Sequence, residues 1–403
     1  MLSGRQFAQR NCYDLITKGK KYNHRPCLAG GVKRLGIPAI AFSDGPRGVV
    51  MGNSTCFPVS MARGAAFNDD LEYEVGTAIA KEAIAGDANY FAGICINLLR
   101  NPRWGRAQET YGEDPFLLGK MGAALTRAVQ DNGVIACPKH FACNSIENIR
   151  FSVDVHADEK TLQEVYFPHF KKCIDAGAMS IMGAYNLLRG EHCCESRYLL
   201  TDVLRGRWHF EGFAITDFLF ALRNGEKAIK AGMDVEMPMK ILYSALPIYL
   251  KSGKISQRDI DTAVRNVLAG LIKITPKIKR QSKDVIACKA HAMLAKKVAC
   301  EGTVLLKNNG ILPLKNIKKI AVVGRYANKI NVGDHGSSSV ASPYTVTPYE
   351  GLCNAFGKEN VVLCESLDIS SRLDEIKDCS CVLICVGSDY KARGRESCKL
   401  LKQ

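Results

Sequence analysis

The segment Gly212-Phe-Ala-Ile-Thr-Asp217 contains the pattern that decides the fold, because a short apolar run ends there in an acidic residue. The same pattern, with a helix-like segment after each run, recurs through the first 240 residues. The other runs are 37–42, 91–97, 134–137, 179–183 and 232–236. Nearly continuous apolar runs that alternate with helices are typical of parallel strands buried on both faces.

Polar side chains of different chemical types follow these runs. They are Asp44, Arg100, Lys139 with His140, Tyr185 with Asn186, Asp217 and Glu236. In a closed (β/α)8 barrel, the C-terminal ends of the strands all face one mouth, where catalysis takes place. An open sheet with a single crevice would not bring so many run ends together. We therefore expect an α/β fold with a TIM-like (β/α)8 barrel, with allowance for a missing or irregular strand.

The pattern changes after about residue 250 and predicts three parts. We expect a barrel over residues 1–250, a helical basic linker region over 251–315 and an incomplete α/β sandwich over 316–403. The predicted strands of the sandwich are the apolar runs at 320–324, 361–364 and 381–387.

The composition excludes several classes of protein. The chain has 403 residues, of which 47% are hydrophobic and 24% charged, so it is neither disordered nor fibrous. No apolar run approaches the ~18 residues of a membrane span, and the start does not read as a secretory signal. The 17 cysteines show no common zinc spacing, and we expect reduced thiols and no metal site. These features predict a cytoplasmic protein without a membrane partner.

The net charge of +15 is concentrated in one part of the chain. Residues 251–330 hold 18 Lys and Arg against 4 Asp and Glu, a net charge of +14 that leaves +1 for the rest. Few aromatic residues lie among these charges, so a nucleic acid would find little to stack on. We interpret the stretch as solvated helix faces and expect no nucleic-acid partner.

Asp217 is the sharpest candidate for chemistry, since a carboxylate at a strand end can act as base, nucleophile or metal ligand. The alternative is a helix N-cap. Lys139 and His140 could hold hydroxyl groups or an oxyanion, or form a structural ion pair. Lys139 could also form a Schiff base, as in barrel aldolases.

Each of the other candidates has a structural alternative. Asp44 lies in a Ser-Asp-Gly-Pro turn that it could cap, and Arg106 could pair with Glu109. Tyr185 could be packed at its strand end with a satisfied hydroxyl group. A mouth rich in such groups, without a glycine-rich phosphate loop, fits a neutral polyhydroxylated ligand such as a sugar.

Several motifs together resemble glycoside hydrolase family 3, the β-glucosidase family. They include Leu35-Gly-Ile-Pro-Ala-Ile-Ala-Phe-Ser-Asp-Gly-Pro-Arg-Gly48, Asn101-Pro-Arg-Trp-Gly-Arg106, Lys139-His-Phe-Ala-Cys-Asn144, Met182-Gly-Ala-Tyr-Asn186, Gly212-Phe-Ala-Ile-Thr-Asp217 and Glu301-Gly-Thr-Val-Leu-Leu-Lys-Asn308. The motifs occur in the order of the family and extend over nearly the whole chain.

The resemblance implies a barrel followed by an α/β sandwich, with the active site between them. It implies hydrolysis of small β-glucosides with retention, through a covalent glycosyl-enzyme and without a cofactor. Asp217 matches the nucleophile of the family. The residues that match its sugar-binding positions are Asp44, Arg106, Lys139, His140, Arg150 and Tyr185.

The chain departs from the family at three points. Phe218 follows the nucleophile where the family often has Trp. Arg393 and Arg395 replace the expected carboxylates of the acid/base loop, which leaves Glu396, displaced by one residue, as the candidate acid/base. The rest of the sandwich is absent, so we expect a C-terminally truncated member with impaired activity. The alternative is an inactive member that at most binds sugar, while the agreement of the other motifs disfavours the aldolase.

Overall fold

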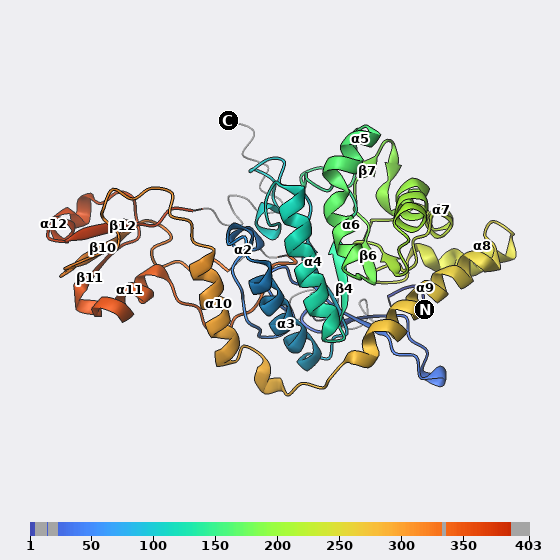
Figure 1. The fold of residues 1–403 in the computed structure, drawn as a ribbon, viewed down its shortest axis with the longest axis horizontal. Coiled ribbons are helices and arrows are strands. Elements are labelled where there is room, and N and C mark those ends of the chain that lie inside the picture. The colour runs from blue at the N-terminus through green and yellow to red at the C-terminus, as the bar shows by residue number, and fades with distance from the viewer. Residues whose placement is uncertain (5–13, 15–22, 333–335, 388–403) are drawn as a thin grey trace.

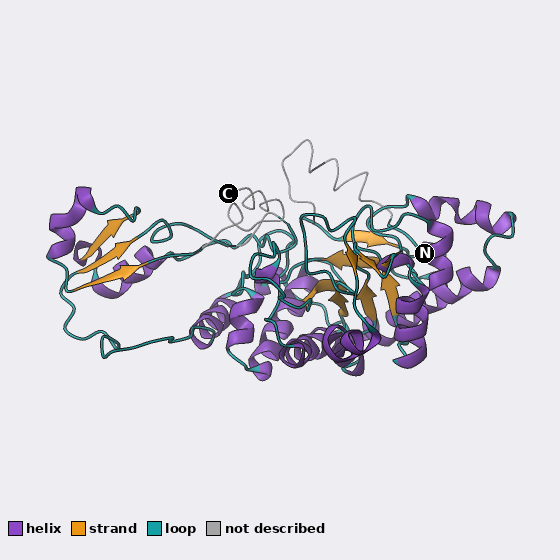
Figure 2. Cartoon of the chain, turned by 90° about the horizontal axis from the view of Figure 1, so that it is seen from above, coloured by secondary structure: helices purple, strands orange, loops and turns teal. Residues whose placement is uncertain are grey.

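The computed structural model describes residues 1–4, 14, 23–332 and 336–387. A barrel with its surrounding helices forms the larger part of the molecule, and a small three-stranded unit lies beyond it (Figure 1). The two parts are joined by a long extended segment and by a returning loop (Figure 2).

Five parallel segments of the barrel coincide with the apolar runs. They are β2 (Ile40–Ser43), β3 (Tyr90–Cys95), β4 (Ile135–Lys139), β6 (Ser180–Met182) and β9 (Phe213–Ile215). Pairs β2–β3, β3–β4 and β6–β9 are parallel, and a parallel bridge between Phe141 and Gly183 joins β4 to β6. Every residue of these strands is buried, as expected for a sheet covered on both faces.

Three short segments close the ring. Val235 pairs in parallel with Ile215 of β9, and Glu236 pairs in parallel with Ser3. Gly4, which follows Ser3 in the chain, pairs antiparallel with Ala29 at the end of β1 (Cys27–Ala29). Strand β1 itself runs antiparallel to β2. Eight segments therefore form a closed barrel in which β1 is reversed. This confirms the TIM-like fold and identifies the irregular strand.

Helices pack along the outside of the barrel (Figure 2). They are α2 (Ser60–Ala65), α3 (Asp69–Ala85), α4 (Pro115–Asp131), α5 (Glu159–Thr161), α6 (Pro168–Asp175), α7 (Gly225–Ala231), α8 (Leu246–Lys251) and α9 (Gln257–Ile274). Local sequence sets their starts. Asp114 caps α4, whose first residue is Pro115, and Ser256 with Asp259 forms a capping box at α9.

Helix α10 (Lys289–Glu301) connects the barrel to the smaller unit and is anchored by Glu82 of α3. Atom Oε1 of Glu82 lies 2.7 Å from Nδ1 of His291 and accepts hydrogen bonds from Thr55 Oγ1 (2.6 Å) and the backbone N–H of Ala287 (3.0 Å). Because Glu82 is buried, each of these bonds replaces one that water would otherwise make. The start of the connecting segment is therefore fixed to the barrel.

The smaller unit is a parallel sheet of β11 (Val361–Cys364), β10 (Ile320–Val323) and β12 (Cys381–Ile384), in that order. Alternate residues of β10 face two different apolar clusters, one with α11 (Pro348–Phe356) and one with α12 (Leu373–Lys377). The last three residues of β12 are 42–60% exposed. The three predicted sandwich strands are therefore present, with β12 at an edge.

No helix in the described part of the chain has the length and apolar character needed to cross a lipid bilayer. The fifteen cysteines that the structure describes are all free thiols, and eight of them are buried.

Candidate active site

Asp44 and Lys139 meet at the mouth of the barrel, at the ends of β2 and β4. Lys139 Nζ donates a hydrogen bond of 2.6 Å to Asp44 Oδ1, and both side chains are buried. Burial disfavours the ammonium group, but the Asp44 carboxylate acts with Cys95 and Glu109 in the other direction, and the pKa of Lys139 lies above its ordinary value. A Schiff base requires a neutral amine, so this pairing argues against the aldolase alternative.

His140 lies between Arg106 and Asp217 and is oriented by Asn97. Its Nδ1 is 3.0 Å from Asn97 Oδ1, and Asn97 Nδ2 donates to the His140 carbonyl oxygen at 2.8 Å. Because an amide oxygen only accepts, this contact assigns the ring proton to Nδ1. Nε2 then faces Arg106 Nη1 at 2.8 Å, as an acceptor, and lies 3.5 Å from Asp217 Oδ2.

Arg106 makes both kinds of contact that the sequence allowed, a structural ion pair and a contact within the candidate site. It pairs with Glu109 Oε2 through Nη2 (2.6 Å) and Nε (3.1 Å), as the structural alternative predicted, and also contacts His140. Burial opposes its charge, but Glu109 raises the pKa of Arg106 well above the ordinary value. Arg106 is therefore a fixed positive charge beside the histidine.

Ser337 brings the smaller unit to this mouth. Its Oγ accepts a hydrogen bond from Arg106 Nη2 at 3.1 Å and lies 3.2 Å from Glu109 Oε2. The next residue contributes too, because Gln108 Nε2 donates to Ser338 Oγ at 3.1 Å. The loop that follows β10 therefore contacts the barrel at the same arginine that contacts His140.

Asp217 follows β9 and presents one carboxylate oxygen to the mouth. Oδ1 accepts a hydrogen bond of 2.7 Å from the backbone N–H of Phe218. Oδ2 is buried and accepts no hydrogen bond from any residue that the structure describes. Asp217 does not cap a helix, since α7 begins later and its N-cap is Asn224. The N-cap alternative for Asp217 is therefore wrong.

Tyr185 and Arg150 form the wall next to Asp217. The Tyr185 hydroxyl group donates a hydrogen bond to the carbonyl oxygen of Phe218. The guanidinium of Arg150 lies 4.4 Å from the centre of the Tyr185 ring, and its Nη1 is 3.2 Å from Glu147 Oε2. The ring of Phe218 lies 4.7 Å from that of Phe42. Tyr185 and Arg150 are therefore held by other residues at this edge of the mouth.

The contacts connect the predicted residues in three groups: Asp44 with Lys139, Arg106 with His140 and Asp217, and Arg150 with Tyr185. Glu396, the candidate acid/base, lies outside the described residues. The sequence reasoning missed Asn97 and Ser337. Asn97 ends the apolar run 91–97 and could have been found as its terminal polar residue, whereas Arg100, which was named instead, is exposed.

Glu236, which also lies at the end of an apolar run, has a structural role. Its carboxylate accepts hydrogen bonds from the backbone N–H groups of 241–243, at 2.8–2.9 Å.

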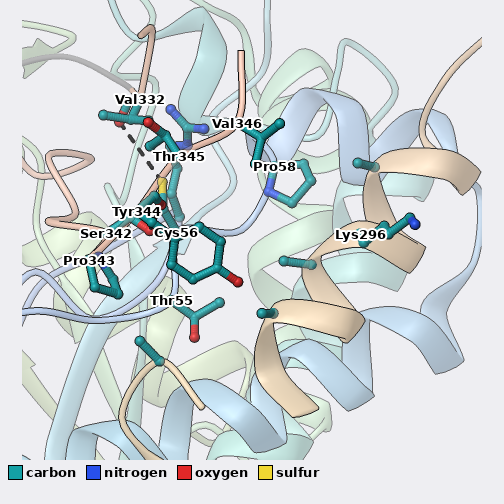
Figure 3. Close-up of a pocket in the computed structure, with 15 residues that line it drawn as sticks. Thr55, Cys56, Pro58, Lys296, Val332, Ser342, Pro343, Tyr344, Thr345 and Val346 are labelled. Carbon is teal, nitrogen blue, oxygen red and sulfur yellow. Dashed lines mark hydrogen bonds between the residues drawn. The ribbon is translucent and has the colours of Figure 1, made fainter. Parts of the chain in front are cut away.

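A separate cavity of about 350 Å³ lies where the barrel meets α10 and the loop 342–346 (Figure 3). Thr55, Lys296 and Tyr344 line it, and none of the predicted site residues does. The mouth of the barrel is therefore the candidate active site.

Comparison with known proteins identifies the family. Residues 20–269 match the glycosyl hydrolase family 3 N terminal domain, and residues 303–400 match the family 3 C-terminal domain. The thermostable beta-glucosidase B of Acetivibrio thermocellus is 36% identical over an alignment of 355 residues, which covers 83% of this chain and 46% of that protein.

Solved structures agree with this result. The structure of beta-glucosidase 3B from Thermotoga neapolitana in complex with glucose is similar with a TM-score of 0.79 and 31% identity, over 88% of this chain and 52% of that one. Beta-glucosidase from Kluyveromyces marxianus in complex with glucose gives a TM-score of 0.78 and 35% identity, over 85% of this chain and 43% of that one. This chain spans about half the length of the relatives that it matches. The chain belongs to glycosyl hydrolase family 3.

Proposed function

We propose that this chain carries the active site of a retaining β-glucosidase, with Asp217 as the nucleophile. The observation that supports this most is the position of Asp217, whose buried Oδ2 lies 3.5 Å from His140 Nε2 and accepts no hydrogen bond from the described residues. The relatives are β-glucosidases, and both of the solved structures compared above hold glucose.

In the proposed reaction, the Asp217 carboxylate attacks the anomeric carbon of the sugar. The bond from that carbon to the aglycone oxygen breaks, and the oxygen leaves with the electron pair and takes a proton from a general acid. Water then attacks the same carbon, gives its proton to that residue acting as base, and releases Asp217. The two carboxyl groups of such a mechanism stand about 5–5.5 Å apart. We assign the second carboxyl group to Glu396.

The remaining predicted residues would hold the sugar in the cleavage site. Lys139 is positively charged and has protons to donate to hydroxyl groups, whereas the Asp44 carboxylate accepts hydrogen bonds from them. Arg106 is a second fixed cation, and it contacts His140, whose Nε2 faces Asp217. Tyr185 and Arg150 would limit the site at its outer edge.

We further propose that the chain is organised as a barrel over 1–250, a helical basic linker region over 251–315, whose helix α9 packs against the barrel, and a partial sandwich over 316–403. The second candidate function is a sugar-binding chain without turnover. The observation that favours it is the presence of Arg393 and Arg395 where the family resemblance implies carboxylates.

Substitution of the nucleophile tests the proposal directly. In Asp217→Asn, turnover of 4-nitrophenyl β-D-glucoside should fall by at least about 10³-fold, because loss of a nucleophile removes the covalent route. The matched control is Asp261→Asn, since Asp261 is exposed on α9. Circular dichroism should show both variants folded. Near-normal turnover in Asp217→Asn would remove Asp217 from the mechanism, and glucose binding without turnover in the unsubstituted chain would favour the second candidate.

A further inference from the structure

The cavity drawn in Figure 3 lies outside the candidate active site and brings together segments that are far apart in the sequence. Barrel residues within 47–58, helix α10 and the loop 342–346 all line it. The backbone N–H of Ser54 donates a hydrogen bond of 2.8 Å to the carbonyl oxygen of Ala341, and Asn53 pairs in parallel with Ala341. The loop is therefore fixed to the barrel beside a cavity of about 350 Å³, a volume typical of small-molecule sites.

Most of the wall of this cavity is apolar. Ala292, Ala295 and Ala299 lie on one face of α10, since they are spaced by three and four residues, and their small side chains leave the space open. Figure 3 shows the ring of Tyr344 projecting from its loop toward this helix. The ring is 60% exposed, so a flat apolar group lying between it and the alanines would be removed from water on both of its faces.

Arg47 adds a buried positive charge to this wall. It is 8% exposed, and its Nε donates a hydrogen bond of 3.2 Å to the carbonyl oxygen of Phe57. Among the described residues, no carboxylate pairs with Arg47 and no group accepts a hydrogen bond from its two terminal nitrogens. A buried cation without a counter-ion is costly, and the planar fork of a guanidinium matches the two oxygens of a carboxylate.

The rest of the wall supplies no acid to compete for Arg47. None of the lining residues that the structure describes is acidic. Glu82 contacts the wall through Thr55, but the hydrogen bonds that anchor α10 already occupy its carboxylate. Lys296 is the other charged residue of the described lining, and in Figure 3 its side chain points away from the Tyr344 ring. Arg47 is therefore the charge that a molecule in the cavity would meet.

We propose that this cavity is a second ligand site, which binds a small aromatic carboxylate with its carboxylate group on Arg47 and its ring between α10 and Tyr344. A neutral sugar fits less well, because an apolar wall leaves covered hydroxyl groups without hydrogen-bond partners. The site is separate from the mouth of the barrel, so the inference does not depend on the proposed function.

Titration of the full chain with trans-cinnamate, followed by NMR of the ligand, tests this proposal. Cinnamate should bind at least about tenfold more tightly than trans-cinnamamide, which has the same shape without the charge, because hydrogen bonds between charged groups are worth at least that much. In Arg47→Met, this preference should fall to about twofold or less.

A second variant tests the cavity without changing the arginine. Ala295→Leu fills the cavity from α10 and should weaken cinnamate binding by at least about tenfold, because the ring and the leucine side chain would occupy the same space. Ala290→Leu is the matched control, since Ala290 is exposed on the same helix and is not among the residues that line the cavity. Circular dichroism should show the variants folded, and Ala295→Leu decides the test if Arg47→Met does not fold.

Several results would overturn the proposal. Equal affinities for cinnamate and cinnamamide would contradict an anion site, and hexanoate binding as tightly as cinnamate would contradict an aromatic ligand. Cinnamate affinity in Ala295→Leu equal to that in Ala290→Leu would place the ligand outside the cavity. Saturating glucose should leave the affinity for cinnamate unchanged, and displacement by glucose would place cinnamate at the mouth instead. Absence of cinnamate binding to the unsubstituted chain would contradict the site altogether.

Discussion

Asn97 determines how His140 is oriented. The amide of Asn97 contacts the backbone N–H, the ring and the carbonyl oxygen of that one histidine, at 2.8–3.0 Å. The resulting tautomer presents Nε2 to Arg106, and the arginine is in turn held by Glu109. The arrangement of charges next to Asp217 therefore depends on Asn97, a neutral residue whose amide contacts His140 and neither Arg106 nor Glu109.

Replacement of Asn97 by alanine should lower kcat/KM for 4-nitrophenyl β-D-glucoside by about 10–100-fold, since it leaves buried groups of His140 without partners. The melting temperature should fall as well. The control is Asn132→Ala, because Asn132 makes a side-chain hydrogen bond to the Ala128 carbonyl oxygen at the end of α4. An Asn97→Ala protein that folds and keeps normal kcat/KM would show that the orientation of His140 does not matter.

The contacts of individual residues could be predicted where polar residues follow strands or, as for Arg106 and Glu109, lie close together in the sequence. Lys139 and Asp44 lie 95 positions apart and meet because β4 and β2 end at the same mouth, which the sequence pattern predicts. Ser337 belongs to a loop of the smaller unit. Its contact with Arg106 depends on how the two units pack, and no local pattern of hydrophobicity carries that information.

At the scale of elements, the apolar runs were predicted, including 232–236, which helps to close the barrel, whereas β1 and residues 3–4 were not. Strands β3 and β4 are buried at every residue, and such strands appear as uninterrupted apolar sequence. β1 has only three residues and runs antiparallel, while residues 3 and 4 pair through single bridges. Segments of this length have no recognisable period, so tertiary pairing alone defines them.

Helix α6 provides a test of stability against pH. Its residue His169 is fully packed, with Nδ1 buried and without a hydrogen-bond partner among the described residues. Burial lowers the pKa of His169 to about 3. The unfolded chain binds a proton at this histidine below about pH 6.5 and the folded chain does not, so folding stability decreases as the pH falls from 6.5 toward 3.

Urea unfolding at pH 7.5 and pH 5.0 measures this contribution. His169 should account for about 2 kcal/mol of the stability lost between these two pH values. In His169→Leu the loss should therefore be smaller by that amount, whatever the stability of the variant at pH 7.5. His209→Asn is the control, since His209 is exposed. Identical pH dependence in His169→Leu and the unsubstituted chain would contradict the assignment.

At the scale of the whole molecule, the smaller unit reaches the mouth of the barrel from a distance. Its sheet lies well apart from the barrel in Figure 1, yet its loop contributes Ser337 and Ser338 to contacts with Arg106 and Gln108. The exposed residues of β12 leave an apolar sheet edge. In the proposed reaction the acid/base residue, Glu396, belongs to this unit, so the proton transfer would depend on the position of the unit.

The rate at which this chain hydrolyses a glucoside should therefore depend strongly on the pKa of the leaving group. A general acid contributes about 10²–10⁴-fold to such a reaction, and a leaving group of low pKa needs it least. We expect slow or absent hydrolysis of cellobiose, a burst of 4-nitrophenol from the aryl glucoside, and acceleration by azide, which attacks the glycosyl-enzyme without needing a base. Efficient cellobiose hydrolysis without an effect of azide would show that a carboxyl group does serve as the acid.

The central claim is that Asp217 becomes covalently attached to the sugar, and trapping of that bond tests it most directly. A 2-deoxy-2-fluoro-β-D-glucoside with a dinitrophenolate leaving group should accumulate the intermediate, because fluorine slows both steps while the leaving group restores the first. After digestion, mass spectrometry should find the fluorosugar on the peptide that contains Asp217, and Asp217→Asn should remain unlabelled. Release of dinitrophenol with the label on another carboxyl group, or without any label, would contradict the account.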